Sequence, residues 1–221
     1  MFHPCNDAFA RCRLSESDET GHRHIGRTKE TAMSTSTEAT TSTSAGLKTW
    51  NIDPSHSGVT FKVRHLMITN VRGEFQKFSG AVKYDPSNLA ASSAEATIEV
   101  GSINTKEQGR DDHLKSADFF DAAKYPNITF KSRAIRQGKE GLEIVGDLTI
   151  RDQAREVVLQ VEGPTPEQKD PWGNTRIGAS AETKIKRSEF GITWNTVLEA
   201  GGVAVSDDIH IHLDLSLVLA K

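Results

Sequence analysis

The stretch DDIHIHLDLSLVL, residues 207–219, alternates apolar and polar side chains from Ile209 to Leu217. Successive side chains on a β-strand point to opposite faces, and a helix would instead spread these leucines around its circumference. The pattern therefore predicts a long strand with one dry and one wet face, as in an antiparallel sheet. The predicted dry face carries Ile209, Ile211, Leu213, Leu215, Leu217 and Leu219, and the wet face carries His210, His212, Asp214 and Ser216.

Similar alternating rows recur upstream and predict about eight strands joined by short links. The spacing of Phe75 and Phe78 breaks the alternation and predicts a bulge or tight bend between them. The other rows expected to face inward are Val59, Phe61 and Val63; Ala94, Ala96, Ile98 and Val100; Ile128, Phe130 and Ser132; Leu142, Ile144, Leu148 and Ile150; Val157, Leu159 and Val161; and Ile177, Ala179, Ala181, Thr183 and Ile185.

These short links leave no room for parallel crossovers, so the sheet is expected to be antiparallel and to cover its own apolar face. An all-β, eight-stranded, lipocalin-like barrel would do this, and a two-sheet sandwich is the alternative. The small inward alanines favour a barrel with space left inside. One short helix is expected within residues 106–121, as a lid over an opening or as a surface helix stapled by Phe119 and Phe120.

Residues 1–46 show no apolar periodicity and are predicted to form a disordered tail ahead of a barrel at 47–221. Met33 offers an alternative start, which would exclude residues 1–32. No signal peptide is evident, which predicts a cytoplasmic protein, or a periplasmic one if the start is mis-set. Cys5 and Cys12 lie in this tail, and their spacing to nearby histidines matches no standard zinc finger.

The net charge of −3 gives no electrostatic reason to expect a nucleic-acid partner. No apolar run approaches the roughly 20 residues of a transmembrane segment, so a soluble protein is expected. The sequence leaves open whether two chains associate as a homodimer.

Several runs resemble the YceI-like polyisoprenoid-binding proteins in order and spacing, from Lys48 to the C-terminus. They include DPSHS at 53–57, VRHL at 63–66, GDLTI at 146–150 and RSEFGI at 187–192, and the most specific is RDDHLKSADFFD at 110–121. The resemblance implies a lipocalin-like extended barrel whose hydrophobic cavity takes an amphiphilic isoprenoid or similar lipid. Many members of that family carry a signal peptide, which this sequence lacks.

The primary hypothesis is a protein that binds, carries or sequesters a long-chain isoprenoid, such as a polyprenyl lipid or an isoprenoid quinone. No cofactor other than this lipid and no metal are predicted. Arg110, His113 and Arg187 are predicted at the rim, for structural ion pairs or for holding a headgroup. The predicted ligand-binding residues are Phe61, Val63, His65, Phe75, Phe78, Ile98, Leu114, Phe119, Phe120, Phe130, Leu148, Ala181, Phe190, Ile211 and Leu213.

The inner rows offer no acid, base, nucleophile or metal ligand, so a non-enzyme is predicted. The competing hypothesis is a metal-dependent or acid–base hydrolase that uses His65 or the His210 and His212 pair. Its weakness is that His210 and His212 share the predicted wet face. A third interpretation is a structural β-domain with a packed core.

Overall fold

The computed structural model describes residues 46–197 and 203–221, which form twelve strands and one α-helix. The predicted tail, apart from Gly46, lies outside the described residues, together with the cysteines and the zinc alternative. The elements are β1 (Lys48–Ile52), β2 (Gly58–His65), β3 (Thr69–Phe75), β4 (Phe78–Tyr84), β5 (Ser93–Glu99), β6 (Ile103–Asn104), α1 (Gln108–Lys115), β7 (Asn127–Gln137), β8 (Leu142–Ile150), β9 (Gln153–Glu162), β10 (Gln168–Lys169), β11 (Thr175–Lys186) and β12 (Val205–Leu219). Four short 3-10 turns join them: η1 (Pro54–His56), η2 (Leu89–Ala91), η3 (Val100–Ser102) and η4 (Arg187–Phe190).

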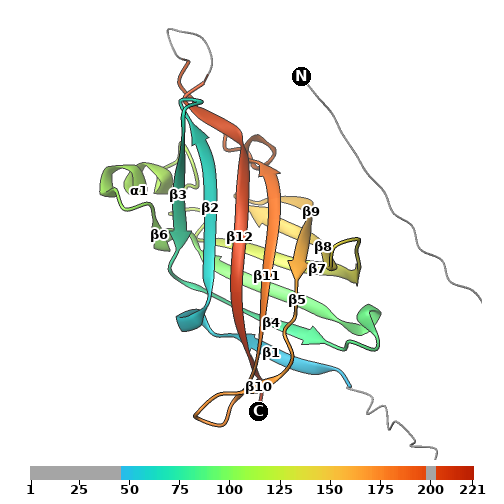
Figure 1. Cartoon of the computed structure of the whole chain (residues 1–221). Coiled ribbons are helices and arrows are strands. Elements are labelled where there is room, and N and C mark those ends of the chain that lie inside the picture. Colours follow the sequence, from blue (N-terminus) through green and yellow to red (C-terminus); the bar gives the residue numbers. More distant parts are fainter. Residues whose placement is uncertain (1–45, 198–202) are drawn as a thin grey trace, which may run out of the picture. The chain divides into compact units, whose positions relative to one another are not determined.

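Eight strands close into an antiparallel barrel (Figure 1). The order around it is β11, β9, β8, β7, β5, β4, β1 and β12, and β12 then pairs with β11 along its length, from Lys186 opposite Asp208 to Arg176 opposite Val218. Within this ring of eight strands each strand has a neighbour on both sides, which a sandwich would not provide. The predicted eight-stranded barrel is therefore confirmed.

The strand β12 is the element around which the sheet is organised (Figure 1). One edge pairs with β11, while the other edge pairs first with β2 and then with β1. Its pairing with β2 ends where Asp214 lies opposite Gly58, and its pairing with β1 begins where Leu217 lies opposite Ile52. The strands β2, β3 and β6 therefore branch away from the closed barrel.

The predicted bend between Phe75 and Phe78 is the point where the chain passes from this branch into the barrel. β3 ends at Phe75 and pairs with β2 and β6, whereas β4 begins at Phe78 and pairs with β1 and β5. At Gly80 in β4, a Cβ atom would lie 2.4 Å from the carbonyl oxygen of Glu95. Only glycine permits this close approach of two strands.

The helix α1 is short, and its N-terminus is capped by the side chain of Glu107, which accepts from the backbone N–H groups of Gly109 (3.0 Å) and Arg110 (2.6 Å). Inside the first turn, the buried Asp111 carboxylate accepts from the backbone N–H of Thr105 at 2.8 Å. The bond from Thr105 ties α1 to the residue that directly follows β6. No helix in the described ranges is long and apolar enough to cross a bilayer.

The buried apolar side chains form two separate clusters. The larger contains Val100, Phe119 and Phe190, and Leu114 and Phe120 from the α1 segment pack against it. The smaller is built on Trp50, Ile177 and Leu217.

Candidate ligand-binding cavity

The inner face of the barrel encloses a cavity of about 260 Å³. This approaches the lower end of the ~300–1,000 Å³ range of small-molecule sites, and it far exceeds the packing defects of ordinary cores. The predicted inward rows line it, except for Val100, Ser132 and Leu219, which are not part of the wall. Its walls also include Ile52, Tyr84 and Pro164 from the region of the smaller cluster, and Ile192 and Val205 beyond β11.

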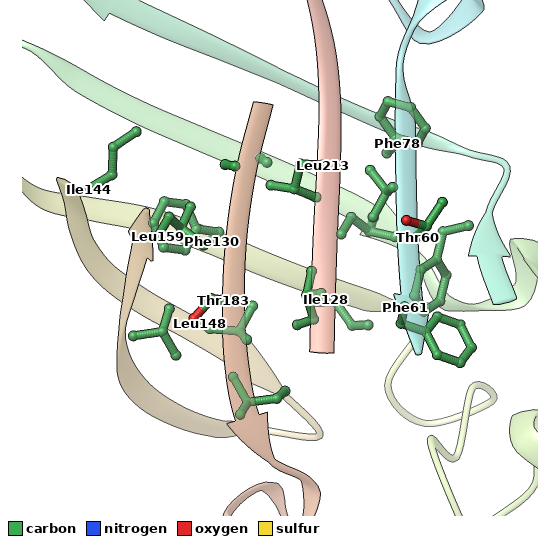
Figure 2. Close-up of a pocket in the computed structure, with 18 of the residues that line it drawn as sticks. Thr60, Phe61, Phe78, Ile128, Phe130, Ile144, Leu148, Leu159, Thr183 and Leu213 are labelled. Carbon is green, nitrogen blue, oxygen red and sulfur yellow. The ribbon is translucent and has the colours of Figure 1, made fainter. Parts of the chain in front are cut away.

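The cavity wall is almost wholly hydrocarbon. Figure 2 shows the hydroxyl oxygens of Thr60 and Thr183 among side chains that are otherwise carbon. The Thr60 hydroxyl donates to the backbone oxygen of His212 at 3.1 Å, so its hydrogen-bonding capacity is already used within the sheet. Glu95 also contacts the cavity, but it is solvent-exposed between the inward Ala94 and Ala96.

Small side chains explain why the barrel is hollow. The predicted inward residues Ala94, Ala96, Ala179, Ala181 and Thr183 all line the cavity. A barrel of about eight strands has an interior just wide enough to be filled by large side chains, so alanines at these positions leave unfilled volume.

Fourteen of the fifteen predicted ligand-binding residues line this cavity. The exception is His65, the last residue of β2, which pairs with Val205 and Thr69 and is not part of the wall. Among the predicted rim residues, Arg187 contacts the cavity, whereas Arg110 and His113 do not. The fourteen lining residues are Phe61, Val63, Phe75, Phe78, Ile98, Leu114, Phe119, Phe120, Phe130, Leu148, Ala181, Phe190, Ile211 and Leu213.

Comparison with known proteins places the chain in a family. The model of the YceI-like domain matches residues 50–217, from the middle of β1 to near the end of β12, and so spans the strands that build the cavity. The chain belongs to the YceI-like family. A UPF0312 protein of Vibrio cholerae is 37% identical over 161 residues, covering 72% of this chain and 82% of the relative. A UPF0312 protein of Staphylococcus aureus is 36% identical over 160 residues, covering 72% and 91%.

Solved structures share this YceI-like architecture. The YCEI protein of Campylobacter jejuni superposes with a TM-score of 0.61 at 33% identity, covering 71% of this chain and 90% of that one. BcnA of Burkholderia cenocepacia gives a TM-score of 0.62 at 29% identity, covering 75% and 98%. A polyisoprenoid-binding domain from Saccharophagus degradans has the same fold, with a TM-score of 0.55 at 15% identity and coverage of 79% and 99%.

Arg187 holds one wall of this YceI-like cavity in place. Its guanidinium donates to the backbone oxygens of Ile192 (2.8 Å), Trp194 (2.9 Å), Ser206 (3.0 Å) and Val205 (3.3 Å). Burial lowers the pKa of Arg187, but a guanidinium is so weak an acid that the side chain remains charged at neutral pH. The side chain joins η4 and the segment after it to the start of β12, a role that needs no carboxylate partner.

Arg110 and His113 are engaged in local contacts of the α1 segment. Arg110 donates from Nε to the Thr105 hydroxyl (2.7 Å) and from Nη2 to the Thr105 carbonyl (2.8 Å). The His113 ring lies 2.9 Å from Asp118 through Nε2 and packs edge-on against Phe119, with ring centroids 5.0 Å apart. Both residues therefore stabilise the segment that carries Leu114, Phe119 and Phe120 to the cavity wall.

The histidines of the hydrolase hypothesis do not converge on the cavity. His210 and His212 lie on the outer face of β12, and His65 lies at the end of β2. Among the described residues no group of three His, Cys, Asp or Glu side chains is arranged to hold a metal ion. His212 instead bridges Glu182 (2.9 Å) and Asp214 (3.0 Å). Burial alone would lower the pKa of His212, but these hydrogen bonds outweigh it and raise the pKa above its usual value.

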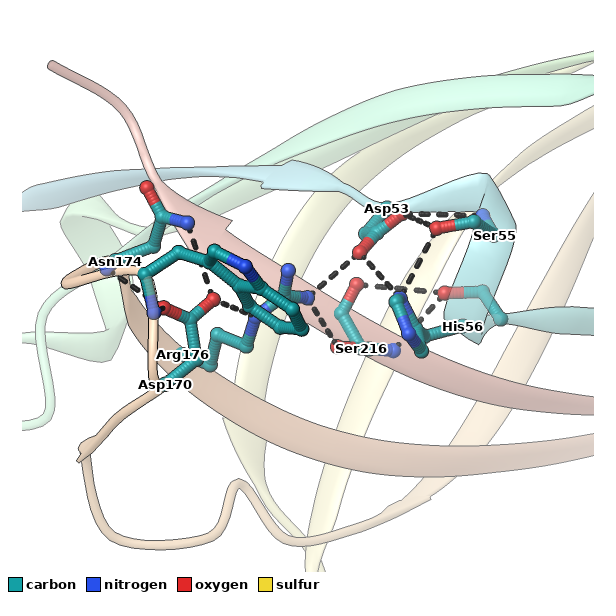
Figure 3. Close-up of polar contacts among 9 residues, drawn as sticks. Asp53, Ser55, His56, Asp170, Asn174, Arg176 and Ser216 are labelled. Carbon is teal, nitrogen blue, oxygen red and sulfur yellow. Dashed lines mark hydrogen bonds and ion pairs between the residues drawn. The ribbon is translucent and has the colours of Figure 1, made fainter.

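A polar network that the sequence analysis missed links β11 and β12 to the turn after β1, outside the cavity (Figure 3). Arg176 of β11 donates to Asp53 at 2.6 Å and to Asp170 at 2.7 Å. Hydrogen bonds from Ser55 and Arg176 hold the pKa of Asp53 well below its ordinary range, and the bond from Arg176 lowers the pKa of Asp170 to about 2. Asp53 and Arg176 are 123 positions apart, so no local pattern could have paired them.

Proposed function

We propose that the cavity binds the hydrocarbon tail of a long-chain isoprenoid, such as a polyprenyl lipid or an isoprenoid quinone, and that the protein carries or sequesters this lipid. The observation that carries the proposal is a hollow of about 260 Å³ whose wall is almost wholly carbon. Burial of one methylene equivalent contributes about 0.8 kcal/mol, so a five-carbon isoprene unit contributes roughly 3 to 4 kcal/mol before ordering costs. Tail length would therefore govern affinity more than headgroup identity.

The chemistry of the wall favours binding over catalysis. Among the described residues that line the cavity, none is a histidine, cysteine, aspartate or serine. Arg187, the one buried charge there, is occupied by four backbone carbonyls. The shared fold with the Saccharophagus degradans domain, described as polyisoprenoid-binding, supports the same class of ligand.

The direct test is mass spectrometry of the natively purified protein before and after extraction with organic solvent. We expect an extra mass of one isoprenoid lipid per chain, removed by the solvent. The extracted protein should then bind a prenyl quinone, measured by quenching of tryptophan fluorescence. Protein that is consistently empty and also ignores added prenyl quinones would contradict the proposal.

A matched pair of variants locates the site. Ala96 is a half-buried lining residue of β5, and Ala134 is an exposed residue of β7 outside the lining. Ala96→Phe places a ring in the hollow and should lower quinone affinity at least tenfold without unfolding the barrel, because it fills empty volume. Ala134→Phe should bind like the parent protein. Equal affinities of the two variants would place the ligand elsewhere.

A further inference from the structure

Large apolar side chains are exposed on the turn between β2 and β3 and on the chain segments beside it. Figure 1 shows this turn at one end of β2 and β3. Ile68 is 71% exposed and Val197 is 81% exposed. The two segments are joined because the backbone N–H of Leu66 donates to the carbonyl oxygen of Ala204 at 2.8 Å. We call this set the apolar tip: Leu66, Met67, Ile68, Val197 and Val203.

Most of the exposed large hydrophobic side chains among the described residues belong to the apolar tip. Among the described residues, the other large hydrophobic side chains that are exposed are Leu47 and Trp172, and neither belongs to these segments. Contiguous exposed apolar side chains on a folded domain mark an interaction surface more often than singly scattered ones do.

The backbone of the tip is unfavourable for the residues that occupy it. The turn is closed by the hydrogen bond from Ile68 N to His65 O at 3.0 Å, and its central residues Leu66 and Met67 have φ angles of 50° and 58°. Bulky side chains rarely adopt this left-handed region, and Asn-Gly is preferred in turns of this kind. Large apolar side chains at these positions lower the stability of the fold, so their presence indicates a role in binding rather than in folding.

A row of basic side chains crosses the outer face of four strands just below the tip. Arg72 of β3 lies opposite Lys62 of β2, Lys62 lies opposite His210 of β12, and His210 lies opposite Lys184 of β11. Like charges directly opposite each other across strands are destabilising. Arg64, which is exposed, lies two residues nearer the tip on the same face of β2.

Among the described residues, most members of this basic row form no ion pair with an acidic side chain. Lys184 pairs with Asp208 at 2.6 Å, but none of the ion pairs among the described residues involves Lys62, Arg72 or His210. The next row away from the tip contains acidic residues, with Glu74 and Glu182 at its ends. On β2 and β3, the basic residues Lys62, Arg64 and Arg72 therefore lie on the side of this acidic row that adjoins the tip.

We propose that the apolar tip inserts into the surface of an anionic lipid bilayer while the basic row contacts the lipid phosphates. Apolar faces of peripheral proteins enter the bilayer by about 5–10 Å. Lys62 lies three residues before His65, at the base of the turn, so its Cα lies about 10 Å below that end of the strand. Long basic side chains at this level reach the headgroups while apolar neighbours enter the acyl region.

The cavity begins directly below the tip. If the cavity binds an isoprenoid lipid, as proposed above, docking of the tip on a membrane would serve transfer of that lipid. Val63 of β2 and Val205 of β12 line the cavity, and Val205 pairs with His65 at the base of the turn. Docking at the tip places this end of the cavity against the membrane, where an isoprenoid lipid would enter or leave.

The test measures binding of the full chain to vesicles of equal parts phosphatidylcholine and phosphatidylglycerol, by co-sedimentation, with pure phosphatidylcholine vesicles for comparison. The parent protein should bind the anionic vesicles, and binding should fall as salt rises from about 0.05 M to about 0.5 M. Leu66→Asn/Met67→Gly supplies the residues that this turn prefers, so it should fold at least as stably as the parent and bind anionic vesicles at least tenfold more weakly. Lys62→Gln/Arg72→Gln should bind more weakly and lose most of the salt dependence.

Trp172→Ser is the matched control, because it removes a 78% exposed aromatic side chain outside the tip and outside the cavity lining. This variant should bind vesicles like the parent. The proposal fails if the parent ignores anionic vesicles, if the turn variant binds like the parent, or if Trp172→Ser loses as much. A parent that sediments as a dimer without binding vesicles, and a turn variant that is monomeric, would assign the tip to self-association and overturn the proposal.

Quinone binding in the absence of vesicles separates this proposal from the previous one. The turn variant should keep the quinone affinity of the parent, since neither altered residue lines the cavity. Vesicle binding that depends on the tip, without quinone binding by any variant, would leave the docking standing and remove the isoprenoid ligand.

Discussion

Replacing Arg187 by methionine is expected to destabilise the barrel strongly. Arg187 is only 7% exposed. It donates to the carbonyl oxygens of Ile192, Trp194, Val205 and Ser206, at 2.8 to 3.3 Å. Methionine retains most of the apolar stem but supplies no donor, so the substitution removes the hydrogen bonds with little change in packing volume.

The magnitude follows from the number of carbonyls that lose a donor. A hydrogen bond contributes about 1 kcal/mol net, and a buried acceptor left without a donor costs about 1–3 kcal/mol. Taking about 1 kcal/mol for each of the four carbonyls, because those near the barrel end can regain water, gives a loss of about 4 kcal/mol in the free energy of unfolding. For a chain of this size, that corresponds to a fall of about 8–16 °C in the melting temperature.

The assay is urea denaturation followed by tryptophan fluorescence, with a thermal melt by circular dichroism. The control is Arg151→Met, because the Arg151 guanidinium makes one exposed hydrogen bond, to the Gly191 carbonyl at 2.9 Å in the same region. That change should cost about 0.5 kcal/mol or less. If Arg187→Met lies within about 1 kcal/mol of the parent protein, the four bonds do not fix this wall and the reasoning is refuted.

Three further predictions concern pH dependence and packing. The folded-state pKa of His212 is raised, so the protonated ring stabilises the fold below the unfolded value near 6.5, and this contribution disappears as pH rises through the folded value. An NMR titration should place the His212 pKa above 6.5 and show it falling in Glu182→Gln; no fall would remove Glu182 as a cause. The depressed pKa of Asp170 stabilises the fold above the unfolded value near 4, and this is lost as pH falls toward about 2. Arg176→Gln should therefore unfold at a higher pH in an acid titration followed by circular dichroism, and an unchanged midpoint would show that the ion pairs contribute nothing. Phe119→Ala empties a buried site beneath α1 and should cost about 3–5 kcal/mol in urea denaturation, whereas a cost under 1 kcal/mol would show that the α1 segment is only loosely packed.

The period-two rows made most of the cavity wall predictable. Side-chain alternation is a local property of an extended chain, so the inward faces of β8, β9, β11 and β12 could be assigned without knowing which strands are neighbours. The small residues Ala96 and Ala179 within these rows indicate a hollow from the sequence alone, and both line the cavity. His65 shows the limit of this reasoning, because it falls on the apolar row of β2, but the strand ends there and the cavity wall ends at Val63.

The amino-acid sequence by itself determined where the strands lie, which of their faces are apolar, and that one short helix leads into a pair of phenylalanines. Only the tertiary structure decided that one edge of β12 pairs with both β1 and β2. It also decided that Arg187 donates hydrogen bonds to backbone carbonyls of the cavity wall, and that Lys62, Arg72 and His210 form a basic row below the apolar tip. The reason is physical: alternation is encoded by neighbouring residues, whereas strand pairing and the partners of a buried guanidinium depend on chain segments that meet only when the barrel closes.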